Sequence, residues 1–180
     1  MNPLDPQADY SVPKTEKQYL SFEEGETEFL PLAGAITGYE YWNEQGKPVR
    51  SSEPFEEMPD DIRIGKDGKP EKIKHFWAFP VWDCSPKATI KIKVLEITQK
   101  TIMKAILSYT RNSKWGSPVM KYSLTVNRDE SGDITAYTVM ANPISEISEE
   151  ITRKWEEAQV NGFNINRLFD GGDPFSAAKQ

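Results

Sequence analysis

The sequence predicts a mainly β protein, built as a five-stranded Greek-key barrel of the OB type with one helix between its third and fourth strands. A C-terminal helix and flexible ends complete the predicted architecture. Two observations lead to this fold class. Short runs rich in aromatic and β-branched residues recur along the chain. One stretch of helical periodicity interrupts them after the third strand, which is the element order of an OB barrel.

The predicted domain covers residues 19–143. Residues 1–18 hold three prolines and few apolar side chains, which indicates a flexible N-terminal arm. Residues 29–42 form a long run of aromatic and other β-prone residues, and Gly34 and Gly38 lie where a strand would bend. We therefore expect one long, curved first strand, or two strands separated by a kink.

The next segment, residues 43–72, is rich in Gly, Pro and charged residues and has little periodicity. Structureless loops of this length inside a compact domain are commonly functional or disordered. We expect this long loop to border a binding site.

Two β-rich runs follow, at 73–82 and 87–97. In the second run, Ile92 and Val94 alternate with Lys91 and Lys93, so we expect the isoleucine and valine to be buried and the lysines to be exposed. The first run carries rings on both of its faces, and only one face can belong to the core.

Lys74 marks the solvent side of the 73–82 run. This phase places Phe76 and Trp82 in solvent and Trp77 and Phe79 in the core. A bulge at Pro80 would reverse the phase for Trp82.

A helix is predicted after the third strand, because apolar side chains recur at helical spacing: Ile102, Met103, Ile106, Leu107 and Tyr109. Residues 120–127 and 134–140 then read as the two strands of a hairpin. Residues 144–158 form an acidic helix, and residues 159–180 form a flexible tail.

The net charge of −6 hides a strong asymmetry along the chain. Residues 1–61 carry 4 basic and 14 acidic side chains, residues 62–128 carry 14 and 4, and residues 129–180 carry 4 and 10. A basic middle between acidic arms indicates a polyanionic partner.

Several function classes are disfavoured. No apolar run is long enough to span a bilayer and the N-terminus lacks signal-peptide features, so we expect a cytoplasmic protein without membrane contact. The single cysteine, Cys84, and the single histidine, His75, cannot build a four-ligand zinc site by themselves. No nucleophile, phosphate-loop or dinucleotide motif is present, so we expect neither enzymatic activity nor a cofactor or metal.

Aromatic residues are interleaved with basic residues over the predicted strands 1–3 and the turn after the helix. Single-stranded nucleic acid needs this combination, because bases stack on rings at about 1–3 kcal/mol each and phosphates need cations. The candidate nucleic-acid-binding residues are Tyr41, Trp42, Arg50, Lys74, Phe76, Trp77, Trp82, Lys91, Lys93, Lys114 and Trp115.

Near the C-terminus, Asp173, Pro174 and Phe175 come after Asp170, so this segment has two acids rather than an acidic run. They resemble the acidic tip, ending in Asp, Pro and Phe, by which bacterial single-stranded DNA-binding proteins recruit replication and repair enzymes. Here five more residues follow the phenylalanine. We expect these three residues to bind replication or recombination proteins.

The phrases YLSFEEGETEFLPL, KHFWAFPVWD, ITQKTIMKAI and SKWGSP, in this order, resemble the phage-encoded single-stranded DNA-binding proteins with an OB core. The resemblance covers residues 19–143. It implies sequence-tolerant binding of single-stranded DNA in replication or recombination, in the host cytoplasm and without a cofactor.

Two other function classes stay open at this point. The same rings could form a protein interface in an OB-type interaction module or a phage structural component. They could also line an oligosaccharide site.

Overall fold

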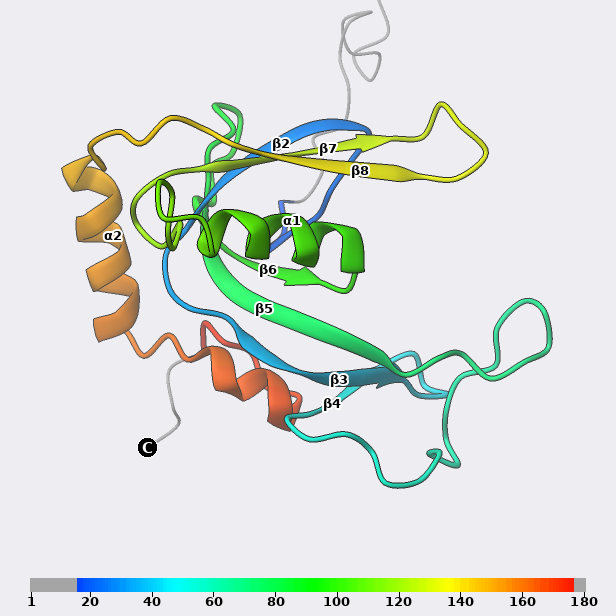
Figure 1. Cartoon of the computed structure of the whole chain (residues 1–180). Coiled ribbons are helices and arrows are strands. Elements are labelled where there is room, and N and C mark those ends of the chain that lie inside the picture. The colour runs from blue at the N-terminus through cyan, green and yellow to red at the C-terminus, as the bar shows by residue number, and fades with distance from the viewer. Residues whose placement is uncertain (1–15, 177–180) are drawn as a thin grey trace, which may run out of the picture.

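The computed structural model describes residues 16–176. Eight strands form one mixed sheet, with α1 packed against it and two further helical elements after it (Figure 1). In chain order the elements are β1 (Tyr19–Leu20), β2 (Gly25–Pro31), β3 (Ile36–Trp42), β4 (Pro48–Ser51), β5 (Lys74–Asp83), β6 (Ile92–Ile97), α1 (Lys100–Thr110), β7 (Leu124–Asp129), β8 (Ala136–Ala141), α2 (Glu149–Val160) and the 3-10 helix η1 (Ile165–Asp170). The mainly β class is confirmed.

The long strand β5 organises the sheet. One of its edges pairs with β6, and the other pairs first with β3 and then with β2. Leu30 is opposite Trp82 and Ile36 is opposite Ala78, so six steps along β2–β3 span four steps along β5. The extra residues form a kink between two separate strands, which agrees with the second of the two predicted alternatives.

The remaining strands leave the sheet open. β2 also pairs with β7, and β7 pairs with β8. Within residues 16–176, β8 does not pair with β6, whose free edge instead takes up β1 in parallel. The sheet order is β1-β6-β5-β2-β7-β8, with β3 and β4 beside β5. The predicted closure into a five-stranded barrel is therefore not confirmed.

The main core lies between α1 and the inner face of the sheet. Of the five apolar positions predicted from helical spacing, α1 buries Ile102, Met103 and Ile106 there. They pack against rings and aliphatic side chains from the strands, including Phe29, Phe79, Leu95, Ile97, Leu124 and Val126. The other two predicted positions, Leu107 and Tyr109, are half-buried.

The 43–72 segment is more ordered than its composition indicates. It contains β4, and isolated bridges join Asn43 to Ile62 and Ile64 to Pro70. The predicted acidic helix covers residues 149–160, so it begins and ends later than expected. It begins there because Ser148 accepts a hydrogen bond from the backbone N–H of Ile151 and caps the helix.

The C-terminal residues fold back onto the sheet. Residues 163–175, here called the C-terminal cover, include η1 and pack on the outer face of β3, β5 and β6 (Figure 1). At Gly38 an added Cβ would clash with the Ser51 carbonyl oxygen of β4 and would lie 3.1 Å from the Phe169 ring of the cover, which explains the glycine. The prediction of a flexible tail is wrong for this segment. Residues 1–15 of the predicted N-terminal arm and residues 177–180 lie outside the described range.

Candidate nucleic-acid interface

The outer face of β5 is buried. Phe76 is 0% exposed, and its ring centroid lies 6.1 Å from that of Phe169 in the C-terminal cover. Leu168 is buried in the same cluster. The predicted exposure of Phe76 is therefore wrong, because the C-terminal cover supplies a second apolar layer that the strand pattern alone does not reveal.

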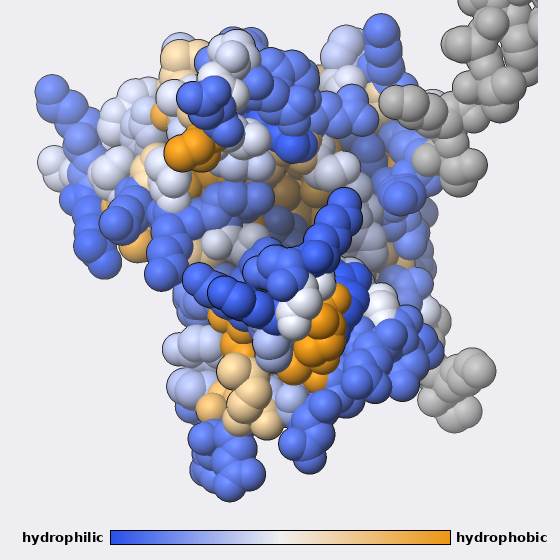
Figure 2. Space-filling model, turned by 90° about the vertical axis from the view of Figure 1, so that its right-hand side faces the viewer, coloured by the Kyte–Doolittle hydropathy of each residue, from blue (hydrophilic) through white to orange (hydrophobic). Residues whose placement is uncertain are grey.

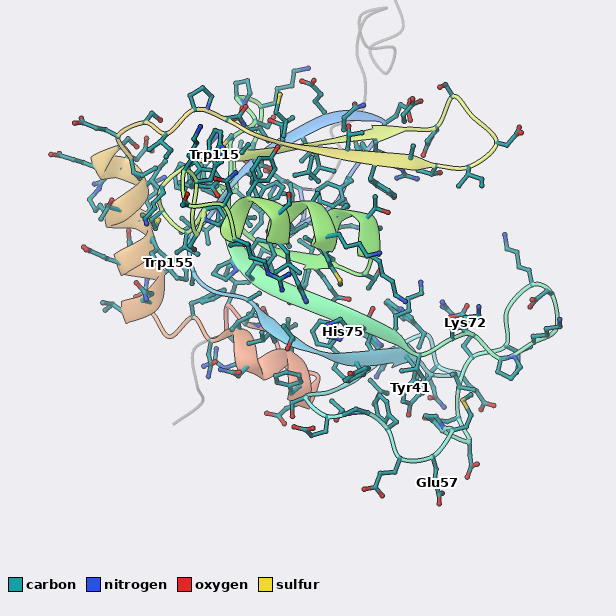
Figure 3. The ribbon with its side chains drawn as sticks, in the orientation of Figure 1. Tyr41, Glu57, Lys72, His75, Trp115 and Trp155 are labelled. Atoms are coloured by element: carbon teal, nitrogen blue, oxygen red, sulfur yellow. The ribbon has the colours of Figure 1, made fainter. Side chains whose placement is uncertain are left out.

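Trp82 is also buried, at 7% exposure. It packs with Leu30, Leu32 and Trp155, the last of which projects from α2 toward the sheet (Figure 3). The predicted exposure of Trp82 is wrong because α2 covers this end of β5. Phe79 lies in the main core as predicted, and Trp77 is half-buried against it.

Arg50 is engaged with two carboxylates. Its Nε lies 3.2 Å from Glu40 Oε2, and its Nη2 lies 2.6 Å from Glu96 Oε2. The guanidinium also stands 5.7 Å from the centre of the Phe76 ring. Arg50 therefore stabilises the covered face, where it is not available to a phosphate while these contacts hold.

Two acids share this one arginine. Burial raises the pKa of Glu40 to about 8, and the neighbouring Glu96 adds to the rise while Arg50 opposes it. Glu40 is 3% exposed. The folded protein thus holds a proton near these carboxylates more tightly than the unfolded chain does.

Glu40 should make the protein less stable at alkaline pH. Its pKa of about 8 lies above the ordinary 4.5, so the stabilisation present below that ordinary value is lost as the pH rises through about 8. Between about pH 5 and pH 9 we expect a loss of at least about 1.4 kcal/mol, the equivalent of one pKa unit. Thermal melting of the wild type and Glu40→Gln over this range tests it, since the variant should show a flatter profile; equal profiles would contradict the assignment.

Lys93 does not line an exposed face. It is 7% exposed, and its Nζ lies 2.6 Å from Asp83 Oδ2 and 3.2 Å from Glu16 Oε1. Burial disfavours its charged form, but the two carboxylates outweigh burial and raise the pKa of Lys93. The predicted exposure of Lys93 is wrong, because Lys93 shares the inner face with Leu95 and Ile97 of the main core. Val94, on the opposite face, is buried as predicted, packed with Leu168 of the C-terminal cover.

Lys91 and Lys74 stay accessible. Lys91 is half-exposed, and its Nζ donates a hydrogen bond to the Ser85 carbonyl oxygen at 2.8 Å. Lys74 is exposed at the start of β5. Both remain candidates for contact with an anion.

Tyr41 and Trp42 stand where β3 runs into the 43–72 segment (Figure 3). Tyr41 is buried and its hydroxyl donates to Asp61 Oδ1 at 2.8 Å. Trp42 is half-buried with the Arg63 guanidinium 5.3 Å from the centre of its ring. Tyr41 thus holds the segment in place, while Trp42 keeps part of its surface open.

The turn after α1 presents Lys114 in solvent beside a half-buried Trp115. The Trp115 ring meets Tyr109 and Tyr122 edge-on, at centroid distances of 5.8 and 5.2 Å. Tyr122 donates a hydrogen bond to the Gly116 carbonyl oxygen at 2.6 Å. Trp115 is therefore fixed by the core on one side and open on the other.

The predicted partner-binding residues are partly folded into the chain. Pro174 is buried and its carbonyl oxygen accepts a hydrogen bond from the backbone N–H of Asn164. The Phe175 ring lies 5.2 Å from that of Phe163. Asp173 alone of the three is exposed. A partner that needs the phenylalanine ring would have to draw it out of this contact.

The basic middle of the chain keeps most of its charge uncompensated. Of its 14 basic side chains, Arg63, Lys93 and Arg128 form ion pairs within residues 16–176. The other 11 have no acidic partner within 4.0 Å in this range: Lys66, Lys69, Lys72, Lys74, Lys87, Lys91, Lys100, Lys104, Arg111, Lys114 and Lys121. All of these are exposed except Lys91, which is half-exposed.

Several of these cations border one end of the molecule. Figure 2 shows this end, where the β7–β8 hairpin and the loop that carries Lys72 project (Figures 1 and 3). Hydrophilic side chains cover most of it, and hydrophobic atoms lie recessed between its upper and lower parts. Lys100 and Lys104 of α1 are absent from the candidates chosen by sequence, although the lack of any acidic residue from 97 to 128 could have indicated them.

Comparison of the chain with protein-family models, with curated proteins and with solved structures finds no match. Among residues 16–176, no helix has the length and apolar character needed to cross a membrane. The same residues contain no group of three or more His, Cys, Asp or Glu side chains that could hold a metal ion.

Proposed function

We propose that this chain is a non-catalytic single-stranded DNA-binding protein built on an OB-type barrel and acting in DNA replication or recombination. The strand order supports the OB assignment. The bent pair β2–β3 corresponds to the first OB strand, β5 and β6 to the second and third, and β7 and β8 to the fourth and fifth. The helix α1 stands between the third and fourth strands, as in OB barrels.

The observation that carries the proposal is the set of 11 basic side chains that have no acidic partner within 4.0 Å among residues 16–176, in a chain whose net charge is −6. The acidic excess of the chain is sufficient to keep it soluble, so solubility does not account for these basic side chains. Uncompensated cations concentrated in one stretch of the chain, residues 62–128, favour a polyanion.

Half-buried tryptophans accompany these cations. Trp42, Trp77 and Trp115 each keep part of their surface open. A base can stack on such a ring without unfolding its surroundings, which favours single strands over duplex. Phe76 and Trp82 would become available only if the C-terminal cover or α2 moved away, so the proposal rests on the rings that are already accessible.

A titration with oligo-dT and with duplex DNA, each followed by tryptophan fluorescence across a series of salt concentrations, tests the function. We expect oligo-dT to quench the fluorescence, with an affinity that falls steeply with salt because bound phosphates release counterions. Duplex DNA should bind more weakly, since its bases cannot reach the rings. Absence of oligo-dT binding at low salt, or binding that ignores salt, would refute the proposal.

A further inference from the structure

The exposed face of α1 carries a stripe of basic residues. Lys100 and Lys104 are one turn apart, and Arg111 follows two turns later, directly after the helix. All three are exposed, whereas Ile102, Met103 and Ile106 on the other side are buried. The helix is thus divided into a core side and a cationic side.

The stretch of sequence that contains this stripe has no acidic residue. Residues 97–128 contain six basic side chains and no acidic one. Helix stability favours an acid in the first turn, because the helix dipole is positive there, yet α1 has no acid in that turn and begins with Lys100. Lys100 is therefore placed against the preference of the helix, as is typical of functional positions.

A half-buried tryptophan stands near each end of the stripe. Trp77 pairs with Ile97, three residues before α1 begins. Trp115 lies just beyond the other end of the helix, next to the exposed Lys114 (Figure 3). The cations thus connect two rings on which bases could stack.

We propose that the phosphates of single-stranded DNA follow the exposed face of α1, bound by the α1 track, which consists of Lys100, Lys104, Arg111 and Lys114. This inference rests on the proposed function and specifies the path of the DNA strand across the protein. The helix rises about 1.5 Å per residue, so Lys100 and Arg111 are about 16 Å apart along its axis. A stacked strand carries one phosphate per about 3.4 Å, and the track therefore spans several phosphates.

An anionic membrane is the other polyanion that a cationic helix attracts. Interfacial helices, however, bury an apolar face in the lipid. The apolar face of α1 is already occupied by the core, and its outer face offers Lys100, Thr101, Lys104 and Ser108. The track therefore favours a nucleic acid.

The test compares two variants of equal charge. The track variant carries Lys100→Gln, Lys104→Gln and Arg111→Gln; glutamine retains good helix propensity. The control carries Lys17→Gln, Lys47→Gln and Arg153→Gln, three exposed positions on other elements. Binding to oligo-dT is measured for both and for the wild type over a salt series, with thermal melting as a check on folding and with anionic vesicles as a second probe.

We expect the slope of log K against log salt to become shallower by about 2 in the track variant, at about 0.7 per lost phosphate contact, while the control keeps the wild-type slope. Equal slopes in all three proteins, or equal losses in both variants, would overturn the track and leave the proposed function standing. Failure of the wild type to bind oligo-dT would instead remove the function on which the track rests. Vesicle binding without DNA binding would assign the stripe to a membrane.

Discussion

Phe76→Ala should lower the free energy of unfolding by about 3–5 kcal/mol, the usual cost of removing a fully buried phenylalanine ring. Phe76 is 0% exposed between the sheet and the C-terminal cover. The truncation would leave a cavity facing Phe169 and remove the ring over which Arg50 stands. In a protein of this size the melting temperature should fall by roughly 6–20 °C.

A matched control is Phe55→Ala, which removes the same side chain from a half-buried position in the 43–72 segment. Its ring contacts Tyr41 at a centroid distance of 5.2 Å, so we expect a smaller loss. Chemical and thermal denaturation of both variants decides the matter. If Phe76→Ala melts like the wild type but binds DNA less well, the ring is exposed and the C-terminal cover does not stay on it.

Local sequence patterns predict the elements whose stabilising contacts are close in sequence or repeat regularly. The three buried positions of α1 are among the five that helical spacing indicates. The glycine-containing break in a long aromatic run likewise predicts the bent strand β2–β3. These features depend on periodicity and on backbone freedom, which the sequence displays directly.

Which face of a strand is buried depends on what packs on it from elsewhere. β5 alternates rings on both sides, and the C-terminal cover, about 90 residues later in the chain, buries the side that Lys74 marks as exposed. No period within residues 73–82 contains that information. The predicted stacking role of Phe76 depended on this choice of face, and so did that of Trp82, which α2 covers on the same side of β5.

The sequence predicts the basic character of the candidate interface, but it does not predict which basic side chains stay exposed. The 14 basic side chains of residues 62–128 are visible in the sequence. The pairing of basic side chains is not visible there, because Lys93 pairs with Glu16, near the N-terminus, and Arg50, outside this stretch, pairs with Glu96 across the sheet. Two of the predicted contact cations thereby become structural, whereas Lys74 and Lys114 remain in solvent.

Lys93→Ala should destabilise the protein by about 3–5 kcal/mol, because it leaves the carboxylate of Asp83 buried without its cation. Asp83 is 4% exposed, and its remaining hydrogen bond comes from the backbone N–H of Ser85 at 2.9 Å. The same change releases Glu16, whose pKa the Thr89 hydroxyl helps to lower to about 2. Lys91→Ala is the control, since that side chain is half-exposed and forms no ion pair within residues 16–176; its cost should stay within about 0.5 kcal/mol.

A double variant separates the lost ion pair from lost packing. Lys93→Met with Asp83→Asn removes both charges and keeps similar volumes, so it should recover much of the stability that Lys93→Ala loses. Urea denaturation of the single and double variants measures the coupling between the two side chains. If Lys93→Ala unfolds at the wild-type urea concentration while the affinity for oligo-dT falls, Lys93 is a free cation on an exposed strand, and β6 has the phase that its alternating isoleucines and lysines predict.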